Sequence, residues 1–128
     1  MNKVILTGNI CKDIQVNESG KGNKVVSNTI AVRREFKNSQ GEYDCDFINF
    51  VAWNGQAEYL GNYAAKGDKI ELCGRIQVRS YENKEGITVY LTEVIVESLN
   101  ILTHNAEKEK ELVDELQEVK DGDKDLPF

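Results

Sequence analysis

The residues whose chemistry stands out lie in one stretch, residues 46–53 (DFINFVAW), which is rich in aromatic and β-branched side chains and is predicted to be a strand. Successive side chains of a strand point to opposite faces, so Phe47, Asn49 and Trp53 share one face. The apolar residues Ile48 and Phe50 point to the other face, which suits a core. Flat rings separated by a polar group could stack on nucleic-acid bases. The alternative is a strand buried on both faces.

A second row of polar and aromatic side chains is expected on a strand over residues 69–81. Arg75, Gln77, Arg79 and Tyr81 fall on its polar face and give two cations, an amide and a ring on one surface. A run of charges is usually just a solvated face. This one differs because it ends on an aromatic ring at a turn.

A third group lies in a polar hairpin loop over residues 33–41. Arg33, Arg34 and Lys37 surround an aromatic residue, Phe36. The ring of Phe36 either packs against the rest of the domain or contacts a flat, anionic ligand, and the sequence leaves both interpretations open.

Five strands and one short helix are expected to position these residues. The helix is predicted at residues 56–66, with Gly67 as its C-terminal cap. It lies between the third and fourth strands, an order typical of the five-stranded Greek-key barrel called the oligonucleotide-binding fold. The sequence therefore predicts an all-β protein with one short helix. The strands are expected at residues 2–10, 24–34, 46–53, 69–81 and 87–102.

Composition limits the remaining possibilities. The chain of 128 residues is long enough for one domain. Its three cysteines, Cys11, Cys45 and Cys73, form no Cys-x-x-Cys and fit neither a disulfide framework nor a zinc site, as is typical of the reducing cytoplasm. With no signal peptide and no apolar run of membrane-spanning length in the sequence, we expect a cytoplasmic protein without membrane contact.

The charge is concentrated at the C-terminal end. Residues 105–128 carry four Lys against nine Asp and Glu, a formal charge of −5, which leaves −1 of the total −6 for residues 1–104. We therefore predict a binding domain over residues 1–104, whose near-neutral charge allows a basic face, and a flexible acidic tail over residues 105–128. The apolar end of the tail is either a frayed terminus or a peptide that docks on another protein.

Catalysis is not expected. Asp44 and Asp46 could in principle hold a metal, but carboxylates before an aromatic strand are more common as polar residues at the end of a hairpin. His104 is the single histidine, so neither a histidine-based triad nor a zinc site is assembled. We predict no enzymatic activity, no cofactor and no metal. An RNA-binding barrel and a protein-interaction barrel remain alternatives of the same fold.

Several motifs in a consistent order carry a family resemblance. They are MNKVILTGN at residues 1–9, DFINFVAW at 46–53, GRIQVRSY at 74–81, TEV at 92–94 and DLPF at 125–128. With these motifs the chain resembles the bacterial single-stranded DNA-binding proteins, which phages and plasmids also encode. The tail departs from the family pattern, since its linker is short and charged where the family's is usually long and uncharged.

The resemblance implies a homotetramer that binds and protects single-stranded DNA of any sequence during replication, recombination and repair. Carried over by position, the base-stacking residues would be Phe36, Phe47, Trp53 and Tyr81. The residues meeting phosphates would be Arg33, Arg34, Lys37, Arg75 and Arg79. The tip that recruits replication and repair proteins would be Asp123, Asp125, Leu126, Pro127 and Phe128.

Overall fold

A computed structural model describes residues 1–103 of the chain; the predicted tail lies outside the described residues. The strand and helix order follows the sequence prediction, with one additional two-residue strand between the first and second long strands. In chain order the elements are β1 (Val4–Ile10), β2 (Asn17–Glu18), β3 (Lys24–Lys37), β4 (Tyr43–Trp53), α1 (Gly55–Tyr63), β5 (Lys69–Glu82) and β6 (Thr88–Thr103).

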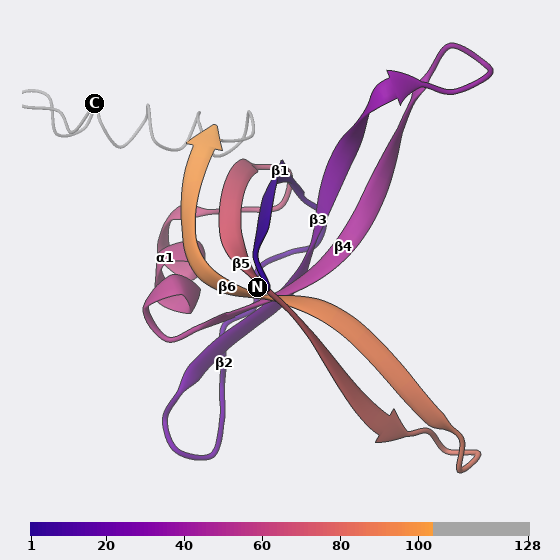
Figure 1. The fold of residues 1–128 in the computed structure, drawn as a ribbon. Helices are drawn as coiled ribbons and strands as arrows, with labels where there is room; N and C mark the ends of the chain where they lie inside the picture. Colours follow the sequence, from indigo (N-terminus) through magenta and orange to yellow (C-terminus); the bar gives the residue numbers. More distant parts are fainter. Residues whose placement is uncertain (104–128) are drawn as a thin grey trace, which may run out of the picture.

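The five long strands close into a barrel (Figure 1). Neighbouring strands follow the order β1-β5-β6-β4-β3, and pairing of β1 with β3 completes the ring. All of these pairs are antiparallel except β4 with β6, which is parallel. The predicted five-stranded oligonucleotide-binding barrel is confirmed.

The barrel interior is filled by the alternate residues that the strand pattern assigned to it. Phe50 is 1% exposed, and Ile30 and Ile70 are fully buried. Helix α1 packs Ala57 and Leu60 against the same core and leaves Glu58 and Asn62 exposed. Burying one face of each strand fixes the register of the sheet, because a slip of one residue would turn the core side chains outward.

Two glycines allow strands to approach closely. A Cβ on Gly8 would overlap the carbonyl oxygen of Ala31, where β1 meets β3 to close the barrel. A Cβ on Gly74 would overlap the carbonyl oxygen of Ile95, where the register of β5 and β6 shifts. Larger residues at either position would push paired backbones apart.

The helix is shorter than predicted. It ends at Tyr63, and Ala64 is extended and buried rather than helical. The predicted cap, Gly67, adopts a positive φ of 94° but in the turn that follows. Its N–H donates to the carbonyl of Ile10 at 2.8 Å, so Gly67 ties this turn to β1 instead of closing the helix.

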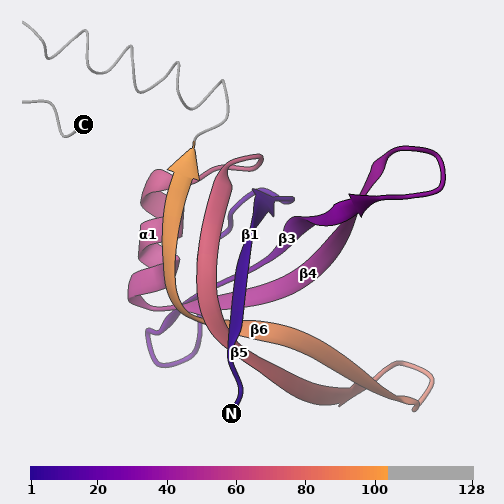
Figure 2. The same ribbon diagram turned by 45° about the horizontal axis from the view of Figure 1, so that its top comes forward.

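Two hairpins extend from the barrel on the side away from α1 (Figures 1 and 2). We call residues 33–47, from β3 and β4, the first arm, and residues 75–92, from β5 and β6, the second arm. Ile76 and Val78 lie on the apolar face of β5, yet they are 45% and 57% exposed. The reason is that β5 leaves the barrel after Gly74, so the second arm has no interior to fill.

The two arms end in the same turn. Asn38 and Asn83 each accept, through the side-chain oxygen, the backbone N–H groups two and four residues further on, at 2.9 to 3.0 Å. In each turn a glycine, Gly41 or Gly86, adopts a φ near 80°. Such side-chain-bonded turns hold the hairpin ends in one conformation.

Candidate single-stranded nucleic-acid interface

The outer face of β4 carries the rings that the strand pattern placed there. Phe47 is 69% exposed and Trp53 is 41% exposed. Between them lies Asn49, whose side-chain oxygen accepts a 3.0 Å hydrogen bond from the hydroxyl of Thr29 on β3. Exposed flat rings held on a rigid sheet are suitable for stacking with bases.

The polar and aromatic side chains of β5 lie on the same face of the sheet as Phe47 and Trp53. Val51 on β4 pairs with Ile95 on β6, and Ile95 pairs in turn with Arg75 on β5. Paired residues of neighbouring strands share a face, so the two rows predicted separately form one continuous surface. Tyr81 lies on this surface near the end of the second arm and is 50% exposed.

Phe36 lies on the first arm and is the most exposed of the four predicted stacking rings, at 83%. It falls between Arg33 and Lys37, where the register of β3 and β4 shifts. It does not fold back onto the body. The five predicted tip residues lie outside the described residues.

Arg34 is bound to a carboxylate. Its Nε and Nη2 donate to Asp46 across the first arm, the shortest distance being 2.8 Å. The hydrogen bond from Arg34 lowers the pKa of the Asp46 carboxyl and raises the pKa of the guanidinium. Both side chains are about half exposed.

Arg79 is paired in the same way on the second arm. Its Nε donates to Oε1 of Glu93 at 2.9 Å, and Glu93 is only 5% exposed. Arg75 instead donates to the neutral side-chain oxygen of Gln77 at 2.9 Å. Within residues 1–103, Arg75 makes no ion pair and keeps its full positive charge available.

Tyr43 is a part of this surface that the sequence prediction missed. The guanidinium carbon of Arg33 lies 3.7 Å from the centroid of its ring, and Nζ of Lys37 lies 5.8 Å from it. The strand was predicted to begin at Asp46, but β4 begins at Tyr43. The alternation that places Phe47 outward, extended by four residues, would have placed Tyr43 on the same face.

Comparison with known proteins identifies the family of this chain. The family model for the single-strand binding protein family matches residues 1–102. The chain belongs to this family. Single-stranded DNA-binding protein 1 of Streptococcus pyogenes serotype M18 is 41% identical over 130 residues, covering 100% of this chain and 99% of that protein.

Other relatives in the single-strand binding protein family are longer than the aligned region. The single-stranded DNA-binding protein of Streptococcus mutans is 43% identical over 109 residues, which cover 85% of this chain and 66% of that protein. That of Lactiplantibacillus plantarum is 42% identical over 110 residues, covering 86% of this chain and 55% of that protein.

The two carboxylates considered as metal ligands have other partners in this family member. Asp46 binds Arg34, and Asp44 accepts a 3.2 Å hydrogen bond from Asn38. Among residues 1–103, no group of three His, Cys, Asp or Glu residues is arranged to hold a metal ion. In the same range no helix is long and apolar enough to cross a membrane.

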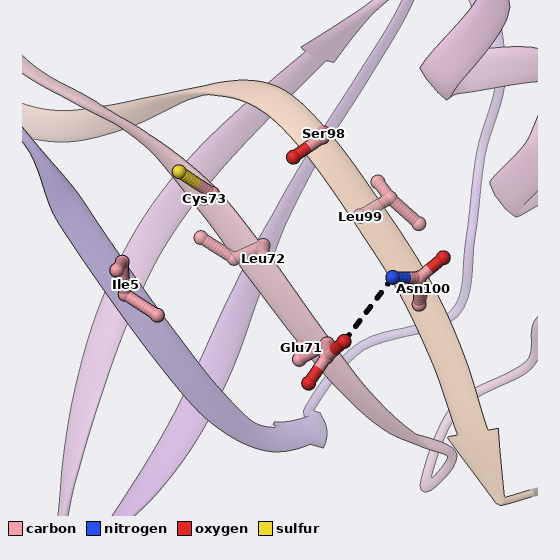
Figure 3. A pocket seen from close by; sticks show the side chains of 7 residues that line it. All are labelled: Ile5, Glu71, Leu72, Cys73, Ser98, Leu99 and Asn100. Atoms are coloured by element: carbon pink, nitrogen blue, oxygen red, sulfur yellow. Dashed lines mark hydrogen bonds between the residues drawn. The ribbon is translucent and has the colours of Figure 1, made fainter.

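A shallow pocket lies over β1, β5 and β6 (Figure 3). Ile5, Cys73 and Ser98 line it from the three strands, and Asn100 donates to Glu71 at 3.1 Å along its edge. Ile5 is 75% exposed. This pocket contains none of the stacking rings predicted for DNA.

Proposed function

We propose that this chain binds single-stranded DNA of any sequence through the outer face of β4, β6 and β5 and through the two arms. The observation that supports this most is one continuous surface with three exposed rings, Phe47, Trp53 and Tyr81. Membership of the single-strand binding protein family also supports binding of single-stranded DNA.

The mechanism follows from the chemistry of the surface. Every base has a flat face, so stacking on aromatic rings contributes about 1–3 kcal/mol per base without selecting a sequence. Cations beside the rings neutralise phosphates and release counterions, so affinity falls with salt. Duplex DNA stacks its bases internally and should bind far more weakly.

The residues divide into two roles. The stacking residues are proposed to be Phe36, Phe47, Trp53 and Tyr81. Arg33, Lys37 and Arg75 are proposed as the main phosphate-facing cations, because within residues 1–103 they form no ion pair with a carboxylate. Arg34 and Arg79 are proposed as weaker phosphate contacts, since their charge is partly compensated by Asp46 and Glu93.

The biological role that fits this chemistry is protection of single strands in the bacterial cytoplasm during replication, recombination and repair. We propose that residues 1–104 carry DNA binding and that the acidic segment 105–128 recruits partner proteins through its DLPF end. A negatively charged tail would also compete with DNA for the cationic surface.

We propose further that the protein acts as a homotetramer. Residues 4–8 of β1 pair only with β5, so their other edge has no strand partner in the described part of the chain. The exposed Ile5 beside this edge adds apolar surface for a second copy (Figure 3). Light scattering after gel filtration tests this, and a monomeric mass would contradict it.

DNA binding is tested by titrating a fluorescently labelled oligo-dT while following its anisotropy and the emission of Trp53, the single tryptophan. We expect tight binding, quenching of Trp53 and no displacement by unlabelled duplex. Effective displacement by duplex, or no binding at low salt, would contradict the proposal. Unlabelled oligo-U as a second competitor measures any preference for DNA over RNA.

A further inference from the structure

The first arm contains an irregularity that brings two cations to one ring. On β3, Arg33 pairs with Cys45 and Lys37 pairs with Tyr43, so four residues of β3 span only two of β4. In a regular strand, positions 33 and 37 would be about 13 Å apart. The register shift lets both side chains reach Tyr43.

The Arg33 guanidinium rests on the ring of Tyr43. The 3.7 Å distance from its central carbon to the ring centroid is that of van der Waals contact, in the arrangement of a cation–π pair. Arg33 forms no ion pair within residues 1–103, in contrast to Arg34 beside it. The guanidinium therefore has one side covered by the ring and keeps its charge.

The position of this pair continues the row of rings along β4. Tyr43 and Phe47 lie on the same face, four residues and about 13 Å apart. Tyr43 is 40% exposed, close to the 41% of Trp53 at the other end of the strand. A single strand that stacks on Phe47 can reach Arg33 by continuing along the arm.

We propose that Tyr43 and Arg33 form a further base-binding platform, in which the guanidinium lies between the tyrosine ring and a DNA base. Planar guanidinium groups stack on bases as aromatic rings do, and Lys37 beside them is placed to meet the phosphate of the same nucleotide. Arg33 thus contacts a base rather than only the backbone. This inference rests on the proposed single-stranded DNA binding and adds a site to it.

The test separates base stacking from phosphate contact by using two probes. One is labelled oligo-dT, and the other is an abasic oligonucleotide with the same number of phosphates. The variants are Arg33→Lys, which keeps the charge but loses the flat group, Tyr43→Leu, and the double variant. Tyr63→Leu is the matched control, since Tyr63 is exposed on α1 and packs beside Tyr59 away from the arms.

We expect Arg33→Lys and Tyr43→Leu each to weaken oligo-dT binding about fivefold or more, while abasic binding and the salt slope stay unchanged. The double variant should lose little more than either single variant, because the two residues act as one unit. Unchanged oligo-dT affinity in both single variants would overturn the platform while leaving the proposed function intact. Failure of the wild-type protein to bind oligo-dT would overturn both.

Discussion

Arg79 on β5 donates a 2.9 Å hydrogen bond to Glu93 on β6, a carboxylate that is only 5% exposed. Burial removes a carboxylate from water, which costs free energy that the hydrogen bond from a charged donor offsets. When that donor is lost, the cost is no longer offset. Arg79 therefore contributes to the stability of the second arm as well as to its surface charge.

Replacing Arg79 should destabilise the protein. We expect Arg79→Ala to lower the free energy of unfolding by about 1–3 kcal/mol, because Glu93 is left buried without this donor. Arg75→Ala is the matched control, since the exposed Arg75 side chain bonds only to Gln77 among residues 1–103, and it should change stability by less than about 0.5 kcal/mol. Urea unfolding followed by circular dichroism measures both, and equal stability of the two variants would contradict the prediction.

Removing the carboxylate of Asp46 should strengthen DNA binding. In Asp46→Asn the guanidinium of Arg34 loses its counter-charge and can meet a phosphate. We expect tighter binding of oligo-dT at low salt and a salt slope steeper by about 0.7. Anisotropy titrations over a range of salt test this, and an unchanged slope would show that Arg34 does not reach the backbone.

The ion pair between Arg34 and Asp46 predicts that stability depends on pH. The pKa of Asp46 is lowered below its ordinary value of 3.8, chiefly by the hydrogen bond from Arg34. Its contribution is therefore present above that value and is lost as the pH falls through the lowered pKa. Wild type should exceed Asp46→Asn in urea midpoint at neutral pH, and the two midpoints should converge in acid below 3.8. A difference between the two urea midpoints that persists below that pH would show that the charge of Asp46 does not cause it.

Gly74→Ala should destabilise the barrel. The added methyl group would overlap the carbonyl oxygen of Ile95, and separating the paired strands costs about 1–3 kcal/mol. Gly20→Ala is the control, because within residues 1–103 no atom beyond the adjoining residues lies within 4 Å of a Cβ at that loop position. Thermal unfolding distinguishes the two, and similar midpoints would show that the strands adjust without cost.

The face proposed to bind DNA can be compared with the opposite face of the second arm. Tyr81 pairs with Val89, whereas Tyr90 pairs with Ser80, so the two tyrosines point to opposite faces. Phe47→Ala and Tyr81→Ala should each weaken oligo-dT binding by about 1–3 kcal/mol without unfolding the protein. Tyr90→Ala, although its ring is 72% exposed, should bind as wild type does. An equal loss in all three variants would indicate that DNA contacts both faces.

Deleting residues 125–128 should leave DNA binding unchanged or make it tighter. The acidic end competes with DNA for the cationic surface, and the deletion removes Asp125 together with the apolar end. Titration of the truncated chain with oligo-dT measures this directly. Weaker binding after truncation would mean that the tail contributes contacts to DNA.

Local pattern in the sequence determined much of this protein. The alternation along residues 46–53 assigned Phe50 to the core and Phe47 and Trp53 to the surface, and the structure confirms both assignments. The order of strands and the helix predicted the barrel, and the motifs predicted the family. These features depend on the spacing of neighbouring residues, which the sequence displays directly.

The tertiary structure decided how the predicted pieces combine. Pairing of Val51 with Ile95, and of Ile95 with Arg75, joined two separately predicted rows into one surface. A register shift on the first arm brought Arg33 onto Tyr43, and departure of β5 from the barrel exposed Ile76. Side-chain alternation is a local property, but strand pairing and ion pairing join residues far apart in the chain. That is why the composition of this surface could be predicted from the sequence, while its continuity and the pairing of its charges could not.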